Sequence, residues 1–383
     1  ADALAAAVPR AGATTPTLVG DATTVVTRGW FGAQRSSPDG GVASPPTGGR
    51  LRVRATASGL GPGDAPALRL AIRGDALHAP LLERVLDVPI DVHAGRVTGE
   101  VTASFDSDAT WHFPRLGGRV AGTGLDFHFW GAPDDCEGVG IDLLLDGADL
   151  HVHSATGRYG AAPLSVSGAV GLNPDTGKYR LVADAAPVEV NALRESLGLR
   201  PLPIAAAGAL RGTLHVTGPL ETPVFSGTAV AAPVPLGGPA AGTTAPEASD
   251  AQTALATTPG ALAAVDRVPL ASAAAVFALD TAADVFMLHS LRAAPAAGGW
   301  VTGGGRLSTA PTAETDPGAV RLAFEVGGLD ADALIAAYAP PGAPPLPAAA
   351  SLGPAHGAAT LVGSHLDAAL DATWAAPAAG ASG

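Results

Sequence analysis

One module occurs three times in this chain, and its order of parts restricts the fold more than any other feature. Each copy has a short helix-like segment, then proline, then two glycines four residues apart, followed by an alternating strand. The copies begin near Gly74, Ala186 and Gly328. Repeated supersecondary units generally stack on their neighbours. The repetition therefore predicts an extended β assembly rather than one round core.

The second copy contains the clearest helix signal. Val190, Leu193 and Leu197 are spaced at three and four residues, which predicts a short helix with these side chains on one face. Pro201 and Pro203 follow. We expect them to end the helix, because proline cannot continue the hydrogen-bond ladder and disfavours the α region for its predecessor.

The other segments alternate apolar and polar residues, which is the period of a strand with one apolar face. Turns between them carry Gly, Asp and Asn-Pro, so the strands are expected to follow one another as an antiparallel meander. The apolar positions that we nominate are Leu125, Phe127, Phe129, Ile141, Leu143, Leu145, Leu150, Val152, Leu164, Val166, Val170, Leu181, Leu210, Leu214 and Val216.

A sheet with one apolar face must bury that face or present it to something apolar. The sheet could fold over on itself, with the short helices closing its ends. Alternatively, the strands could curl around a lengthwise apolar groove lined by the nominated residues. The pattern of residues alone favours neither arrangement.

Several stretches resemble the TamB-like (AsmA-like superfamily) component of the chloroplast inner-envelope translocon, the TIC complex. They are VEVNALRESLGLRPLPIAAAGALRGTLHVTGPLETPVFSG, LLERVLDVPIDVHAGRVTGEV, SATGRYGAAPLSVSGAVGLNPDTGKYRL, AAVDRVPL and LDATWAAP. The resemblance extends in order over residues 74–377. The chain departs from the family in its many Ala, Gly and Pro residues and in a long insert after Pro233.

The resemblance implies a mainly β fold, namely an elongated, twisted antiparallel sheet curled into a taco-like or solenoid groove, with a few short helices between repeat units. It further implies an envelope-bridging scaffold in preprotein import, anchored to the inner envelope by a part of the protein outside this segment and lying in the intermembrane space. The implied partners are an outer-envelope β-barrel translocon and inner-envelope translocon subunits. The wider superfamily implies an alternative, a conduit that carries phospholipid acyl chains along the groove.

Composition predicts where the repeats are interrupted. Ala-, Thr- and Pro-rich segments of low complexity favour disorder or surface loops. The expected parts are a disordered leader (1–20), β-groove repeat units (21–185), the repeat core of a short helix and strands (186–232), a low-complexity insert (233–262), a further β-groove unit (263–377) and a flexible tail (378–383).

Charge and chemistry narrow the function classes. The net charge of -13 argues against nucleic acid as a partner and against docking on anionic lipid. No apolar run approaches the roughly 20 residues that a membrane helix needs. Cys136 lacks a neighbouring cation or base, and Asp134 and Asp135 before it suggest a hydrated turn. Because no phosphate loop, nucleophile elbow or acid–base pair is found, we expect neither an enzyme nor a cofactor.

Overall fold

The computed structural model of the chain describes residues 18–25, 49–58, 67–80, 90–106, 114–198, 205–233, 249–308, 316, 318–340, 344, 351–364 and 368–375. The chain divides into two compact units. One comprises Ala1–Gly160 with Leu164–Leu181, and the other comprises Ala161–Pro163 with Val182–Gly383. Each unit is described by itself.

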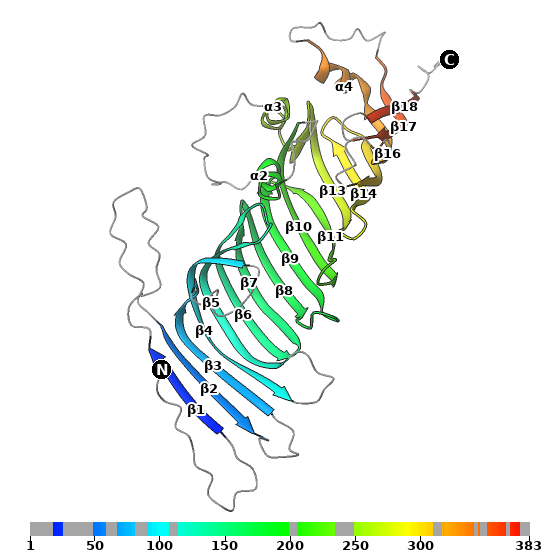
Figure 1. The fold of residues 1–383 in the computed structure, drawn as a ribbon. Coiled ribbons are helices and arrows are strands. Elements are labelled where there is room, and N and C mark those ends of the chain that lie inside the picture. The colour runs from blue at the N-terminus through cyan, green and yellow to red at the C-terminus, as the bar shows by residue number, and fades with distance from the viewer. Residues whose placement is uncertain are drawn as a thin grey trace, which may run out of the picture. The chain divides into compact units, whose positions relative to one another are not determined.

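The first unit is an antiparallel sheet in which every strand from β1 to β7 pairs with the next along the chain (Figure 1). Strand β9 returns beside β8, where Gly168 lies against the backbone of Leu181. The strands are β1 (Leu18–Val25), β2 (Arg50–Ser58), β3 (Ala67–His78), β4 (Ile90–Asp106), β5 (Arg115–Phe129), β6 (Asp135–Gly147), β7 (Asp149–Tyr159), β8 (Ala162–Gly171) and the start of β9 (Lys178–Glu189), whose residues from Val182 on belong to the second unit.

The second unit is also an antiparallel meander. The short strand β12 pairs with both β10 and β13 beyond the end of β11, so it fills the gap that β11 leaves. The strands are β10 (Ala206–Pro219), β11 (Val224–Ala232), β12 (Ala263–Val265), β13 (Val268–Asp280), β14 (Val285–Pro295), β15 (Trp300–Ser308), β16 (Val320–Asp330), β17 (Pro354–Gly363) and β18 (Ala368–Ala375). The predicted fold class, mainly β and antiparallel with a few short helices, is confirmed.

Two helices lie where the module predicts them, between one strand and the glycine-bearing strand that follows. Helix α2 (Val190–Ser196) follows β9, and α4 (Ala331–Tyr338) follows β16. The Glu189 carboxylate caps α2 by accepting hydrogen bonds from the backbone N–H groups of Asn191 and Ala192. The apolar face predicted for α2 is only partly right, because Leu197 is 45% exposed. The corresponding helix of the first copy falls outside the described residues.

The insert after Pro233 contains a helix that the composition did not predict. Helix α3 (Asp250–Thr257) begins with a capping box formed by Ser249 and Gln252. It packs on β10 and β12, where Ala251 is fully buried against Ala207 and Ala264. The low-complexity insert was expected to be disordered or a surface loop, and this prediction is wrong for the residues of α3. Strand β1 likewise begins at Leu18, within the expected leader.

The repeated glycines mark places where neighbouring backbones approach closely. In each copy a Cβ atom on the second glycine would collide with a carbonyl oxygen of the next strand. The distances from that Cβ are 2.4 Å to Arg119 O for Gly99, 2.1 Å to Thr228 O for Gly212 and 2.3 Å to Thr373 O for Gly357. Glycine within a strand typically allows such close approach or a tight bend. The second glycine of the module therefore makes the same close approach to the next strand in all three copies.

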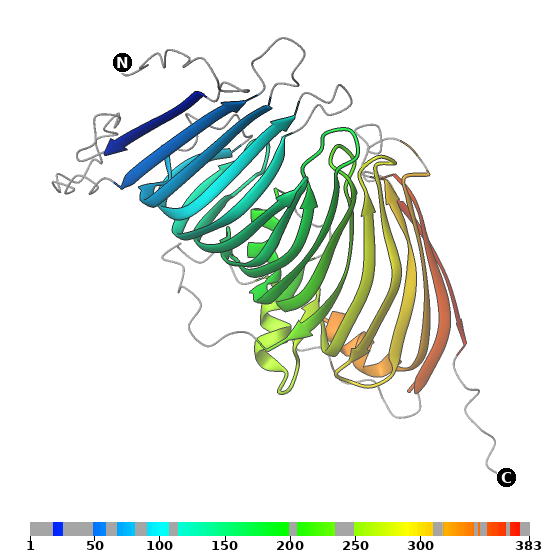
Figure 2. The ribbon, with the colours of Figure 1, turned by 90° about the horizontal axis from the view of Figure 1, so that it is seen from below.

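The ribbon of each unit is a single layer of curved strands (Figure 2). Among the described residues, no large side chain is fully buried, as expected of a sheet without a second layer over its apolar face. No described helix has both the length and the apolar character needed to cross a membrane.

Candidate functional site

The apolar residues of β2, β3, β4 and β5 form rows across one face of the first unit. Because directly paired residues of an antiparallel sheet point to the same side, the register defines the members of each row. The rows are Ala55 with Leu70, Ala103 and Leu116; Val53 with Ile72, Val101 and Gly118; and Leu51 with Gly74, Gly99 and Val120. We call this side the apolar face of the first unit.

The nominated residues of β6 and β7 continue these rows. Leu143 lies between Val120 on β5 and Val152 on β7. Leu145 similarly pairs with Leu150. All of these side chains are half-buried. The structure thus brings nominated residues from neighbouring strands together on one face.

A small buried cluster forms where the apolar face meets the bulged ends of β5 and β6. Leu125 is 6% exposed and packs with Val97, Val139 and Ala79. Phe127 and Ile141 border this cluster, whereas Phe129, 47% exposed, touches Phe127 edge-on at 5.2 Å between ring centroids. The nominated set therefore includes both core positions and positions open to solvent.

Strands β8 and β9 carry the next nominated residues, which are likewise half-buried. Leu164, Val166, Val170 and Leu181 have this burial, and the serines that alternate with Leu164 and Val166 are exposed. This alternation is typical of a strand with one apolar side.

The apolar face of the second unit contains three rows of paired residues without a charged side chain. Leu210 and Gly212 of β10 lie near the end of that strand where β12 pairs with it. One row joins Leu214, Gly227, Phe277, Leu288, Gly305, Leu322, Leu361 and Leu370; a second joins Val216, Phe225, Leu279, Phe286, Leu307, Val320 and Gly363; the third joins Gly212, Ala229, Ala275, Leu291, Gly303, Phe324, Ala359 and Ala372.

Because the sheet is a single layer, the large side chains in these rows are covered mainly by their neighbours in the sheet, and most of them are half-buried. Phe277 and Phe286, for example, stack on each other at 5.8 Å between ring centroids. A contiguous apolar surface of this kind is typical of a site for an apolar ligand or partner. That the nominated residues line a groove remains a prediction.

The opposite faces are polar. Arg119 donates from Nε and Nη2 to the two carboxylate oxygens of Asp142, at 2.8 and 2.6 Å, and these hydrogen bonds lower the pKa of Asp142. Arg180 pairs with Asp149 at 3.1 Å. Both pairs are largely exposed, so they contribute little to stability.

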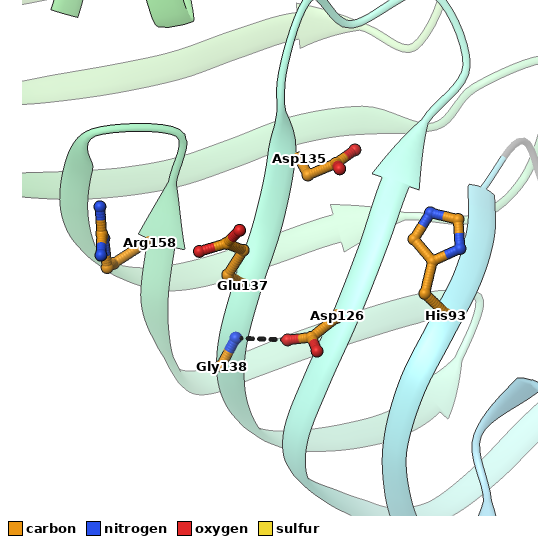
Figure 3. A pocket seen from close by; sticks show the side chains of 6 residues that line it. All are labelled: His93, Asp126, Asp135, Glu137, Gly138 and Arg158. Carbon is orange, nitrogen blue, oxygen red and sulfur yellow. Dashed lines mark hydrogen bonds between the residues drawn. The ribbon is translucent and has the colours of Figure 1, made fainter. Parts of the chain in front are cut away.

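An open polar hollow of about 400 Å³ lies among β4, β5, β6 and β7 (Figure 3). The Gly138 N–H donates to Asp126 Oδ1 at 2.7 Å, and His128 Nδ1 lies 2.7 Å from Asp135 Oδ1. The hollow is lined by His93, Asp126, Asp135, Glu137, Gly138 and Arg158. In the parts of the chain that the structure describes, no three His, Cys, Asp or Glu side chains are grouped so as to hold a metal. We assign the hollow no chemistry.

Cys136 lies within β6, not in the turn that the sequence suggested. Its thiol packs against the cluster around Leu125, and burial together with the negative charges of Asp135 and Asp134 raises its pKa to about 11. The expectation that nothing near Cys136 depresses the thiol pKa is confirmed. A raised pKa removes the thiolate that nucleophilic chemistry requires.

Cys136 is therefore expected to react slowly with iodoacetamide at pH 8. A thiol pKa about two units above 9.0 lowers the thiolate fraction, and hence the rate, roughly a hundredfold. The rate should rise as pH approaches 11, and in urea it should match that of a small thiol. Mass spectrometry of timed samples measures it. Equal rates in buffer and in urea at pH 8 would contradict the burial of this side chain.

Two chloroplast proteins match the chain over most of its length. The chain is 32% identical over 299 residues to Protein SUBSTANDARD STARCH GRAIN 4, chloroplastic, of Oryza sativa subsp. japonica. It is 33% identical over 309 residues to Protein TIC236, chloroplastic, of Arabidopsis thaliana. Each match covers 78% of this chain, but only 14% of the first relative and 13% of the second. No family model matches, and neither does any solved structure.

Proposed function

Because the chain belongs to the TamB-like family of chloroplast proteins that includes TIC236, we propose that it is a segment of an envelope-spanning scaffold. In this proposal the complete protein links the outer-envelope and inner-envelope translocons during import of preproteins into the chloroplast. The chain would lie in the intermembrane space of a protein anchored to the inner envelope. Its partners would be the outer-envelope β-barrel translocon and subunits of the inner translocon.

The observation that carries this proposal is the match to TIC236, together with the repetition of one module within the chain. A repeat array grows by adding units, so its length can be adjusted to a gap that a globule cannot span. The matched relatives are several times longer than this chain, which leaves room for many such units. The proposal assigns the chain no catalytic residue and no cofactor.

The test uses the complete protein in isolated chloroplasts. Purified from solubilised envelopes, it is expected to bring down both outer-envelope and inner-envelope translocon subunits, and its depletion is expected to slow preprotein import. A depleted chloroplast that imports at the normal rate, with neither translocon in the purified sample, would exclude the scaffold.

The uncharged rows of the second unit favour a second candidate function, a conduit for phospholipid. Acyl chains gain about 0.8 kcal/mol for each methylene removed from water, so a long apolar face is suited to hold them. Within one such row Phe277 on β13 pairs with Leu288 on β14, and Leu322 on β16 follows beyond Gly305 of β15.

Mass spectrometry of lipid extracted from the purified chain separates the two candidates. The conduit predicts co-purifying phospholipid and transfer of labelled phospholipid between vesicles in the presence of the chain. A lipid-free chain that transfers nothing would exclude the conduit and leave the scaffold as proposed.

A further inference from the structure

Trp300 lies flat on the polar face of the second unit. Gly303 and Gly305 of β15 belong to the apolar rows, so the alternate residues Trp300 and Thr302 point to the opposite face. A Cβ atom on Gly327, which is directly opposite Trp300, would lie 2.4 Å from Cε2 and Cζ2 of the indole and 2.7 Å from its Nε1. Because these ring atoms are at similar distances from one point, one flat side of the indole covers the glycine. The side chain is still 48% exposed, so its other flat side faces solvent.

Polar side chains stand beside the exposed indole. Thr302 is flanked in its row by Arg292 on β14 and Glu325 on β16. Both charged residues are exposed, and the side chain of neither forms a hydrogen bond or an ion pair in the part of the chain that the structure describes. Diagonal neighbours on adjacent strands are about 7–8 Å apart, within reach of long side chains. Arg292 and Glu325 can therefore both contact a ligand that rests on Trp300.

His356 on β17 is the next polar neighbour, and its orientation is fixed. The backbone N–H of Gly328, which follows the covered glycine, donates to His356 Nδ1 at 3.3 Å. A ring nitrogen that accepts a hydrogen bond carries no proton, so Nε2 carries the proton and is left to donate. The side chain is exposed. We call Trp300, together with Arg292, Thr302, Glu325 and His356, the Trp300 platform.

We propose that the Trp300 platform binds a neutral sugar that stacks on the indole, and that β-galactose is the best-suited pyranose. One face of this sugar has a continuous patch of C–H groups, which the negative face of an aromatic ring attracts. Its hydroxyl groups project from the rim, and each can both donate and accept a hydrogen bond. Arg292 and His356 supply donors to these hydroxyls, and Glu325 supplies an acceptor.

The composition of the platform suits a neutral polar ligand better than an ion or an apolar chain. Arg292 and Glu325 have opposite charges, so an ion attracted by one of them is repelled by the other. An acyl chain would cover both groups without replacing the hydrogen bonds that they make to water. A sugar replaces those hydrogen bonds with its own hydroxyls while its C–H face covers the indole.

Saturation-transfer NMR of the intact chain with lactose tests this proposal. We expect a dissociation constant of about 1 mM, with the largest signals from C–H protons of the galactose ring. Trp300→Leu keeps an apolar side chain over Gly327 but removes the flat ring, and it should weaken binding at least about tenfold. Trp374→Leu is the matched control, because Trp374 is 56% exposed and opposite Gly357 but lies on the apolar face. It should change binding less than about twofold.

Glu325→Ala and added salt supply readouts that do not depend on the stability of the Trp300 variant. Glu325→Ala removes an exposed side chain and should weaken lactose binding about threefold through the lost hydrogen bond. Added salt should leave lactose binding unchanged, since the ligand is neutral. Absence of a lactose signal would overturn the proposal. So would equal weakening in Trp300→Leu and Trp374→Leu.

Vesicles distinguish two sources of the sugar. Lactosylceramide in phosphatidylcholine vesicles presents the same disaccharide as a lipid headgroup. Binding to these vesicles but not to plain phosphatidylcholine vesicles, lost in Trp300→Leu, would identify a glycolipid, whereas lactose binding without vesicle binding would identify a soluble glycan. Equal binding to both kinds of vesicle without a lactose signal would overturn the sugar site. The platform lies on the polar face, so these results leave the scaffold and the conduit untouched.

Discussion

Replacing Leu143 by aspartate is expected to lower the free energy of unfolding by about 3 kcal/mol, because the substitution removes apolar burial and places a carboxylate among apolar neighbours. Val120 and Val152 flank Leu143 in its row, and neither valine side chain can pair with the new charge. Leu144→Asp is the matched control. The cross-strand neighbours of Leu144 are Arg119 and His151 on the polar face. The free energy of unfolding of this variant should therefore fall by less than about 1 kcal/mol.

Urea unfolding followed by circular dichroism measures both variants on the whole chain. The two substitutions change the same residue type on the same strand, one position apart, so strand propensity and net charge are matched. Similar midpoints for the two variants would mean that Leu143 and Leu144 do not lie on different faces. In that case the apolar rows, and with them the groove prediction, would be wrong.

For β6 and β7, the sequence predicted which side chains share a face, because the alternation of apolar and polar residues agrees with the pairing register of the strands. Leu143, Leu145, Leu150 and Val152 were nominated from the period of two alone, and antiparallel pairing then places them on one face. The alternation of apolar and polar residues is a local property of the sequence and does not depend on distant parts of the chain. It therefore remains recognisable in a sequence that is rich in alanine and glycine.

Local capping and cross-strand bulges were harder to predict. Helix α3 was missed because alanine and threonine dominate its surroundings, although Ser249 and Gln252 form a recognisable capping box. The depth of burial also differed among nominated residues. Leu125 is enclosed because it pairs with Val139 within the cluster, whereas Phe129 is the last residue of β5 and lies beyond the last pair with β6.

The second large effect is expected at the repeated glycines. Gly99→Ala should lower the free energy of unfolding by about 3 kcal/mol, since the added methyl group would lie 2.4 Å from Arg119 O and must push two paired strands apart. Gly212→Ala and Gly357→Ala meet carbonyl oxygens at 2.1 and 2.3 Å, so we expect losses of similar size in the other two copies.

Gly140→Ala is the matched control for these variants. Gly140 also lies within a strand of the first unit, but the nearest atom to its added methyl group would be Thr156 Oγ1 at 3.7 Å, an ordinary contact. Alanine restricts the unfolded chain more than glycine does, so this variant should gain about 0.5 kcal/mol. Urea midpoints compare all four variants. If Gly99→Ala were as stable as Gly140→Ala, close approach of the backbones could not explain why the glycine recurs. Losses at all three repeated positions, with none at Gly140, would instead mean that the close approach of the next strand requires glycine at the second position of the module.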